Sequence, residues 1–228
     1  MRKLLLTIVF VVAFVSSASA GTIIIDFATG SALVGGTITY SGSGVHGDQP
    51  LVGSNIGIGQ VGRTDVPLGP YVVTGTNGGW GVLSFTTGKF NTYIPSLHEY
   101  LFSPGGSLTI VGGVPSAGIP NGTVLLSAPL ISAVYTSKGA LSLAIAAGSD
   151  TKNATLLAFL GVSGNPQFNF SGTVHAQTIT GGTGKSLTGV ATISTDIVNS
   201  ATVVPEPGAS VLLGVGLIAL AFIGRRFF

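Results

Sequence analysis

Residues 167–178 read Gln-Phe-Asn-Phe-Ser-Gly-Thr-Val-His-Ala-Gln-Thr, and this stretch decides the fold class. Its apolar side chains recur at even-numbered positions, and polar side chains fill most of the positions between them. The apolar set is Phe168, Phe170, Val174 and Ala176. Successive side chains of a strand point to opposite faces, so this period of two residues predicts a half-buried β-strand.

Outward from this stretch, ten more short apolar runs are separated by turns rich in glycine or proline, and each predicts a strand. They span Thr22–Ala28, Thr37–Ser41, Tyr71–Thr74, Gly81–Thr86, Ser107–Gly112, Thr123–Ser127, Ile131–Thr136, Leu141–Ala147, Ala154–Leu160 and Gly189–Asn199. Short strands at this spacing predict an all-β fold, an antiparallel β-sandwich or jelly-roll-like single domain. Alanine and leucine favour helices, so Leu141–Ala147 and Ala154–Leu160 are also open to a helical reading. Residues 42–70, with eight glycines and three prolines, are predicted to form a long irregular loop.

Charge is scarce in the chain, and four of its nine basic residues lie in the two terminal segments. Charged residues make up 7% of the sequence, against about a quarter in an average soluble protein. Without Arg2, Lys3, Arg225, Arg226 and Glu206, five basic and six acidic residues remain, a net charge of −1. This balance excludes the basic surface of a nucleic-acid-binding protein. The chain has no cysteine, which excludes disulfides, thiolate metal sites and a cysteine nucleophile.

The first 20 residues have the three parts of a secretory signal peptide. Two basic residues precede the apolar stretch Leu4–Val15, which is shorter than the roughly 20 residues of a membrane-spanning helix. Small residues follow, with Ala18 and Ala20 in the A-x-A positions. We therefore predict cleavage by signal peptidase after Ala20, which leaves Gly21 as the new N-terminus. The alternative is an uncleaved N-terminal anchor.

A second targeting pattern lies at the C-terminus. Residues 208–224 form an uncharged apolar run, and a helix over this run would be about 25 Å long, slightly short of a roughly 30 Å hydrocarbon core. Arg225 and Arg226 would keep the C-terminus in the cytoplasm. Together with the N-terminal signal, the run predicts a transmembrane helix and the export of residues 21–199, with residues 200–204 as a spacer.

Just before this run, Pro205, Glu206 and Pro207 complete a three-part ending. The ending resembles the PEP-CTERM sorting signal of Gram-negative, exopolysaccharide-producing bacteria, over residues 204–226 and in the same order of motif, apolar helix and arginines. The sorting segment as a whole spans residues 205–228. Its last two residues, Phe227 and Phe228, follow the arginines and depart from the family's pattern. The resemblance implies that an exosortase-type membrane enzyme reads the Pro-Glu-Pro motif, cleaves near it and releases the body to the cell surface or biofilm matrix. A permanent single-pass anchor is the alternative.

The motifs that resemble catalytic or cofactor sites lack their required context. Gly42–Gly47 and Gly57–Gly62 match G-x-G-x-x-G, but neither precedes a helix, as a dinucleotide site requires. Gly181–Ser186 is similar to the end of a P-loop, yet it lies between two predicted strands and is better explained as a hairpin loop. His46 and Asp48 could offer two metal ligands, but no second closely spaced pair accompanies them. We therefore predict no catalytic residue, no metal and no cofactor.

Aromatic residues between positions 71 and 102 are the remaining candidates for ligand binding. Tyrosine and tryptophan can stack on sugar rings while their polar ends stay in water. The candidate sugar-stacking residues are Tyr71, Trp80, Tyr93 and Tyr100, and the alternative is that they belong to the core. The sequence thus predicts an exported, noncatalytic surface or extracellular-matrix protein. A carbohydrate-binding module that uses these aromatics is the first alternative, and a secreted polysaccharide hydrolase with paired carboxylates is the second.

Overall fold

A computed structural model describes residues 22–29, 36–75, 79–136, 140–145, 150–163, 168–181 and 187–202. For residues 140–145 and 169–202 the description is limited to the backbone. The predicted signal peptide with Ala18, Ala20 and Gly21 lies outside the described residues. So do the sorting motif Pro205–Pro207, the apolar run 208–224, and Arg225 and Arg226. The compact unit described below is Thr22–Ala201.

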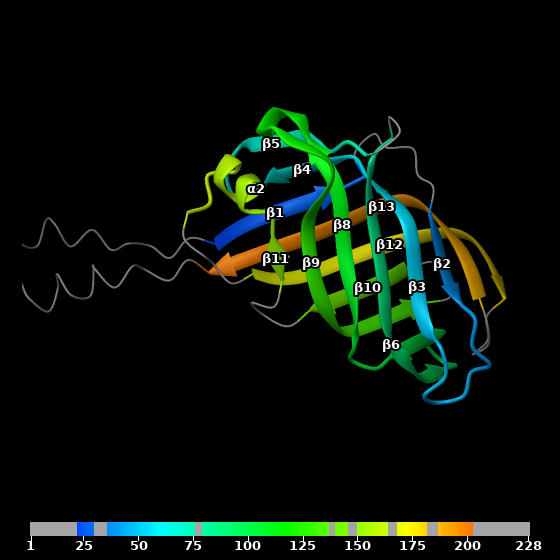
Figure 1. The fold of residues 1–228 in the computed structure, drawn as a ribbon. Coiled ribbons are helices and arrows are strands. Elements are labelled where there is room, and N and C mark those ends of the chain that lie inside the picture. The colour runs from blue at the N-terminus through cyan, green and yellow to red at the C-terminus, as the bar shows by residue number, and fades with distance from the viewer. Residues whose placement is uncertain are drawn as a thin grey trace, which may run out of the picture. The chain divides into compact units, whose positions relative to one another are not determined.

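The described chain is almost entirely β-strand (Figure 1), with one turn of 3-10 helix and one short α-helix. In chain order the elements are β1 (Thr22–Ala28), β2 (Thr37–Tyr40), β3 (Pro50–Ile58), β4 (Gln60–Arg63), β5 (Leu68–Val72), β6 (Gly81–Ile94), β7 (Glu99–Phe102), β8 (Gly106–Val114), η2 (Pro115–Ala117), β9 (Ile119–Thr136), β10 (Ala140–Ile145), β11 (Thr151–Lys152), α2 (Ala154–Phe159), β12 (Phe168–Gly181) and β13 (Leu187–Thr202). The strand pairs with a defined register are antiparallel, which confirms the all-β prediction. Within these ranges, no helix has the length and apolarity to cross a lipid bilayer.

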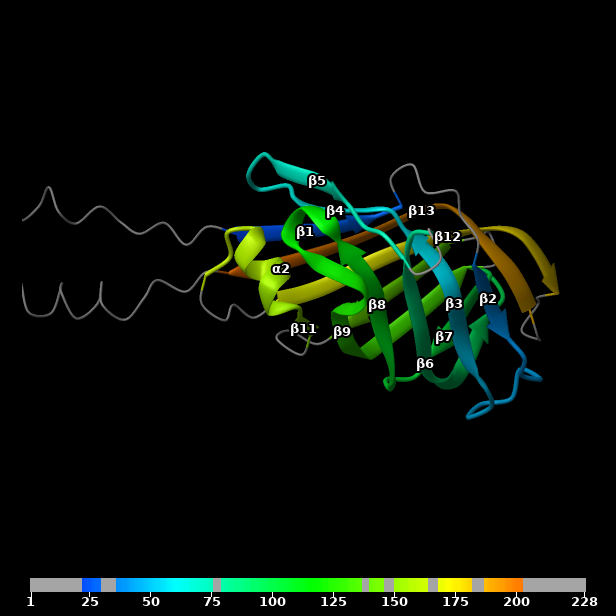
Figure 2. The same ribbon diagram turned by 45° about the horizontal axis from the view of Figure 1, so that its top comes forward.

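The thirteen described strands belong to one hydrogen-bonded sheet. Its order is β12-β10-β9-β7-β6-β3-β2-β13-β1-β4-β5, and the pairing of β12 with β13 closes the first eight strands into a ring. β8 pairs with both β6 and β9. Figures 1 and 2 show β2, β3, β6, β8 and β9 in one layer, with β1, β10, β12 and β13 crossing behind it. The path ends at β5, which contains Pro70, a residue suited to an edge strand because it has no N–H to donate.

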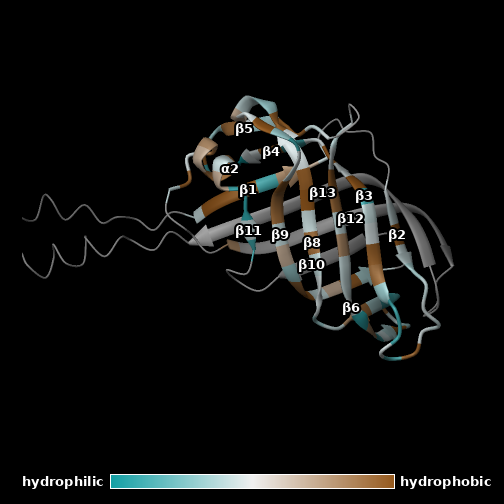
Figure 3. Cartoon of the chain, viewed as in Figure 1, coloured by the Kyte–Doolittle hydropathy of each residue, from teal (hydrophilic) through white to brown (hydrophobic). Residues whose placement is uncertain are grey.

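The core lies between the two crossing layers. Alternate residues of the strands are buried, as Ile25 and Phe27 are in β1, and hydrophobic segments alternate with polar ones along β3 and β9 in Figure 3. Phe168, the first residue of the alternating stretch, is also buried. Four aromatic side chains, called the aromatic cluster below, pack within this core: Tyr40, Phe90, Tyr100 and Phe102.

The prediction of an irregular loop over residues 42–70 is wrong. This segment contains β3, β4 and the first part of β5. Two features of β3 obscure its alternation: Asn55 has a φ of 56°, and the register with β6 shifts between Gly53 and Ile56, which indicates a bulge. Gly53 also lies under the ring of Phe85, where a Cβ atom would be only 2.0 Å from the ring. Glycine in this strand therefore makes room for a core side chain.

Other boundaries also differ from the prediction. Thr123–Ser127 and Ile131–Thr136 are parts of one long strand, β9, and the strand β7 was not predicted. Of the two readings left open for Ala154–Leu160, the strand is wrong and the helix is confirmed, since these residues include the helix α2. Asn153 caps that helix, because its Oδ1 accepts a hydrogen bond from the backbone N–H of Leu156 at 3.1 Å. β13 extends to Thr202 and so includes the start of the predicted spacer.

Arg63 connects β4 to β1 and to the end of α2. Its guanidinium forms an ion pair with Asp65, with 3.1 Å between Nε and Oδ1, and its Nη1 donates to the carbonyl oxygens of Leu160 (3.2 Å) and Gly161 (3.5 Å). Asp65 in turn accepts the backbone N–H of Ile24 at 2.9 Å. The hydrogen bond from Arg63 is the main reason why the pKa of Asp65 lies below its ordinary value. One partly buried ion pair thus joins three distant segments of the chain.

We expect Arg63→Ala to lower the free energy of unfolding by about 2 kcal/mol, because it removes the hydrogen bonds that Arg63 donates to one carboxylate and two carbonyl groups. Chemical denaturation of the full-length protein measures this loss. Lys89→Ala is the matched control, since Lys89 is exposed on β6, and we expect it to change stability by less than about 0.5 kcal/mol. Equal effects of the two substitutions would show that Arg63 contributes no more than an ordinary surface charge.

Candidate functional site

An open groove of about 460 Å³ lies where η2 connects β8 to β9. We call it the η2 groove, and its lining residues are Thr74, Gly75, Gly79, Pro115, Ile119, Pro120 and Asn121. Its volume falls within the roughly 300–1,000 Å³ of ligand-binding pockets. No ionisable side chain is among the described lining residues, so they offer neutral hydrogen-bonding groups and apolar surface.

Three side chains are aligned on one face beside this groove. Thr74 is bridged to Trp80 on one side and to Gly113 on the other, both in antiparallel fashion. Directly opposed residues of an antiparallel pair share a face of the sheet, so the indole of Trp80 lies on the same face as the Thr74 side chain. The Thr74 hydroxyl donates a hydrogen bond to Oδ1 of Asn121 at 2.5 Å. The order across this face is therefore Trp80, Thr74, Asn121.

Two glycines next to these three side chains, Gly75 and Gly113, have no room for a Cβ atom. A Cβ atom at Gly113 would lie 2.5 Å from Oδ1 of Asn121 and 2.8 Å from its backbone nitrogen. A Cβ atom at Gly75 would lie 2.0 Å from the carbonyl oxygen of Trp80. Larger residues would therefore push the Asn121 and Trp80 strands away from Thr74, so these glycines maintain the spacing of the three side chains.

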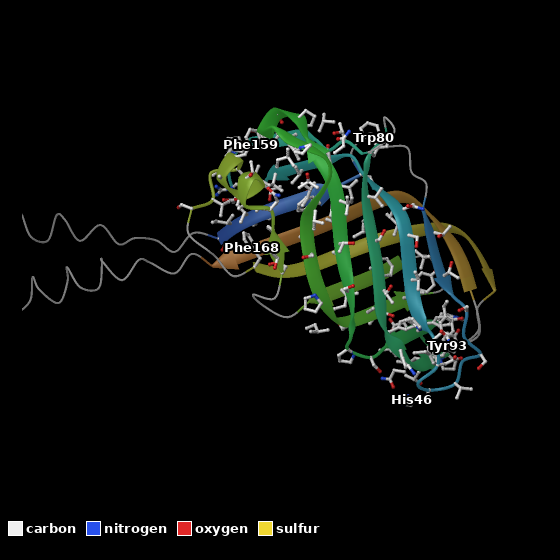
Figure 4. The ribbon with its side chains drawn as sticks, in the orientation of Figure 1. His46, Trp80, Tyr93, Phe159 and Phe168 are labelled. Carbon is white, nitrogen blue, oxygen red and sulfur yellow. The ribbon has the colours of Figure 1, made fainter. Side chains whose placement is uncertain are left out.

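The four predicted sugar-stacking residues do not form one surface. Figure 4 shows Trp80 and Tyr93 at opposite ends of the body. Tyr93 is half-buried against Tyr100, with ring centroids 4.9 Å apart, and Tyr71 is half-buried against Phe159 at 4.6 Å. Of the four, Trp80 is the one with an exposed side chain, at 36% relative exposure, and it lies beside the groove.

The prediction that Tyr100 stacks on sugars is wrong. Its side chain has no exposed surface, because it packs inside the aromatic cluster against Tyr40 and Phe90. Strand β7 points Tyr100 and Phe102 to the same buried face. A ligand in solution therefore cannot reach this ring.

The histidines with described side chains take part in local contacts. Nδ1 of His46 lies 3.0 Å from the carbonyl oxygen of Asn91, and Nδ1 of His98 lies 3.3 Å from the Tyr93 hydroxyl. Asp48 accepts hydrogen bonds from the backbone N–H and hydroxyl of Ser43, the first of which contributes most to lowering the pKa of Asp48. Among the side chains that the structure describes, no three His, Asp or Glu residues gather as metal ligands would.

A buried ion pair lies elsewhere in the body, between Lys152 of β11 and Asp150. Both side chains are only 1% exposed, and Nζ of Lys152 lies 3.5 Å from the ring centroid of Phe168. Oδ1 of Asp150 has no hydrogen-bond partner among the described residues. Burial lowers the pKa of Lys152 to about 8, although the contact with Asp150 acts in the opposite direction.

The sequence indicates Trp80, which lies next to the lining residue Thr74, and misses the residues that line the groove. Trp80 is a plain candidate from its residue type, whereas Thr74 and Asn121 are 47 positions apart and meet only through tertiary structure. No family model, curated protein or solved structure matches the chain. The description of the site therefore rests on its geometry.

Proposed function

We propose that this protein is an exported, noncatalytic component of the cell surface or extracellular matrix, associated with exopolysaccharide. The observation that carries this proposal is the order of the C-terminal segments: the Pro205-Glu206-Pro207 motif, the apolar run 208–224, and the arginines 225 and 226. In this proposal the protein is anchored in the cytoplasmic membrane before an exosortase-type enzyme processes it, and afterwards it lies outside the cell.

The properties of the body support this placement. It has no cysteine, so its folding does not depend on the redox state of the compartment. Its one hydrophobic core extends from β1 to the start of β12. For the finer architecture we propose a sandwich-like or jelly-roll-like arrangement of the two crossing layers.

Alanine substitution of Pro205, Glu206 and Pro207 tests the sorting step. In a Gram-negative host with an exosortase, we expect this variant to be exported but to remain in the membrane fraction. The unaltered protein should yield a released species that starts at Gly21 and ends near Pro205, as read by intact mass. The matched control replaces Thr202 and Val203, which precede the signal, with alanines, and a second control uses a host without the exosortase.

Two results would contradict the proposed processing. One is unchanged release of the triple-alanine variant, which would show that the motif is not the recognition element. The other is a mature protein that still carries Phe228 in the host with the exosortase, which would identify a permanently anchored ectodomain.

Carbohydrate binding by the body is a second candidate function. The observation in its favour is the exposed Trp80 next to an uncharged groove that also presents Asn121. We keep the secreted hydrolase as a lower-ranked alternative, tested by turnover of polysaccharide substrates by the full-length protein.

A further inference from the structure

We propose that the η2 groove, together with Trp80 beside its lining residue Thr74, binds an uncharged polysaccharide chain, with Trp80 as the stacking residue and Asn121 as a hydrogen-bonding residue. This inference rests on the proposed function, because it names the matrix component that the body would recognise. It assigns the contact to one end of the sheet and to two specific side chains.

The exposure of Trp80 is the first argument. Tryptophan has the largest apolar side chain and is mostly buried in folded proteins, yet the single tryptophan of this chain is 36% exposed. Its backbone pairing with Thr74 fixes the strand that carries it. A rigid, partly exposed indole gives a flat apolar surface, on which the C–H face of a sugar ring can stack at low entropic cost.

The hydrogen-bonding groups of the groove provide the second argument. Because Oδ1 of Asn121 accepts the Thr74 hydroxyl, the N–H donors of the same carboxamide point away from Thr74. Asn121 is exposed, so its donors can reach the hydroxyl oxygens of a bound sugar. Apolar stacking combined with a few oriented polar groups is the general composition of a small-molecule site.

The absence of charge in the lining supports a neutral ligand. Recognition of a uronate or sulfate would need a basic side chain for charge-assisted hydrogen bonds, and none of the described residues lining the groove is basic. A peptide strand is also disfavoured. It would need an unpaired strand edge, whereas Thr74 already pairs with Trp80 on one side and Gly113 on the other.

The fluorescence of Trp80 provides a direct test, since it is the only tryptophan in the chain. The full-length protein in detergent micelles would be titrated with neutral hexasaccharides of glucose, mannose and galactose, and with a hexuronate. We expect at least one neutral hexasaccharide to shift the emission and to protect the indole from acrylamide quenching. The hexuronate should bind more weakly.

Variants connect that signal to the groove. We expect Asn121→Ala to weaken binding by about fivefold, the effect of losing one neutral hydrogen bond. Trp80→Ala, followed by calorimetry, should weaken it by roughly tenfold or more. Leu97→Ala is the matched control, because Leu97 is exposed (56%) in the turn between β6 and β7, outside the groove. It should bind as the unaltered protein does.

Several outcomes would overturn the assignment. They are no response of Trp80 to any neutral hexasaccharide at millimolar concentration, tighter binding of the hexuronate, binding of a proline-rich peptide in place of sugars, or unchanged binding by Trp80→Ala. Comparing the membrane and extracellular fractions of these variants distinguishes the groove assignment from the proposed sorting and function. Release of the body without sugar binding overturns the groove assignment alone, whereas failure of release bears on the proposed function.

Discussion

Replacing Lys152 with methionine is expected to destabilise the body by about 3–5 kcal/mol, the usual effect of removing one partner of a buried ion pair. Asp150 would then lose its cationic partner although its side chain is only 1% exposed, and its Oδ1 already has no partner among the described residues. The contact of Nζ with the Phe168 ring would be lost as well. Guanidinium denaturation of the full-length protein measures the difference.

The double variant Asp150→Asn with Lys152→Met is the control for this interpretation. It removes both charges, and we expect it to recover most of the lost stability, because neutral replacement of buried pairs is often close to neutral in free energy. If the double variant is as unstable as Lys152→Met alone, the loss comes from packing around residue 152 and not from the unpaired carboxylate.

The same pair gives stability a pH dependence with a defined sign. Deprotonation of Lys152 differs from its replacement by methionine, because the neutral amine can still donate a hydrogen bond to Asp150. Burial lowers the pKa of Lys152 to about 8, against an ordinary value of 10.5 in the unfolded chain. The unfolded state therefore binds more protons between these two values, so stability increases with pH over that window. This contribution, about 3 kcal/mol, is fully present above pH 10.5 and is lost as the pH falls through 8. The double variant should lack it, and denaturation at pH 7 and pH 10 measures the difference.

The strands that the sequence predicts well are those with one face in the core and clear turns at both ends. Thr22–Ala28 matches β1 without any shift, and Ser107–Gly112 lies within β8. Their alternation reflects burial directly, because every second side chain enters the same hydrophobic cluster. Local pattern and tertiary environment agree in these segments.

The pattern fails where a residue's role depends on a distant neighbour. Glycine at position 53 suggests a loop, but it is required in β3 because the ring of Phe85 occupies the space of a Cβ atom. The bulge near Asn55 also interrupts the alternation of β3. The Phe85 contact and the bulge arise from pairing between strands that no short window of sequence contains. Ala154–Leu160 differs, because the sequence left both a strand and a helix open, and the local cap at Asn153 favours the helix.

In the candidate site too, some residues can be predicted from the local sequence and others depend on distant contacts. Trp80 is identifiable from its residue type, whereas its partners depend on the pairing of Thr74 with Gly113. Tyr100 is a different case, because the alternation within its own strand, β7, indicates that its side chain is buried. Tyr100 and Phe102 alternate with Glu99 and Leu101, which places both rings on one face, and that face is buried. The alternation of β7 was a better guide to Tyr100 than its aromatic residue type.

The aromatic cluster gives the second large effect: Phe90→Ala is expected to lower the free energy of unfolding by about 3–5 kcal/mol. Phe90 is 1% exposed, and its ring centroid lies 5.2 Å from that of Tyr40 and 5.9 Å from that of Phe102. For a body of this size, such a loss should lower Tm by about 10 °C.

Two variants distinguish the loss of packing from other causes. Phe90→Leu keeps most of the volume and should lose less than half as much stability as Phe90→Ala, because a smaller cavity remains. Leu97→Ala removes a side chain that is 56% exposed and should change stability by less than about 0.5 kcal/mol. If Phe90→Ala and Leu97→Ala have similar Tm values, the aromatic cluster does not contribute to stability as its burial implies. A large loss in Phe90→Ala with an intermediate one in Phe90→Leu would show that the close packing of β2, β6 and β7 around this ring stabilises that part of the sheet.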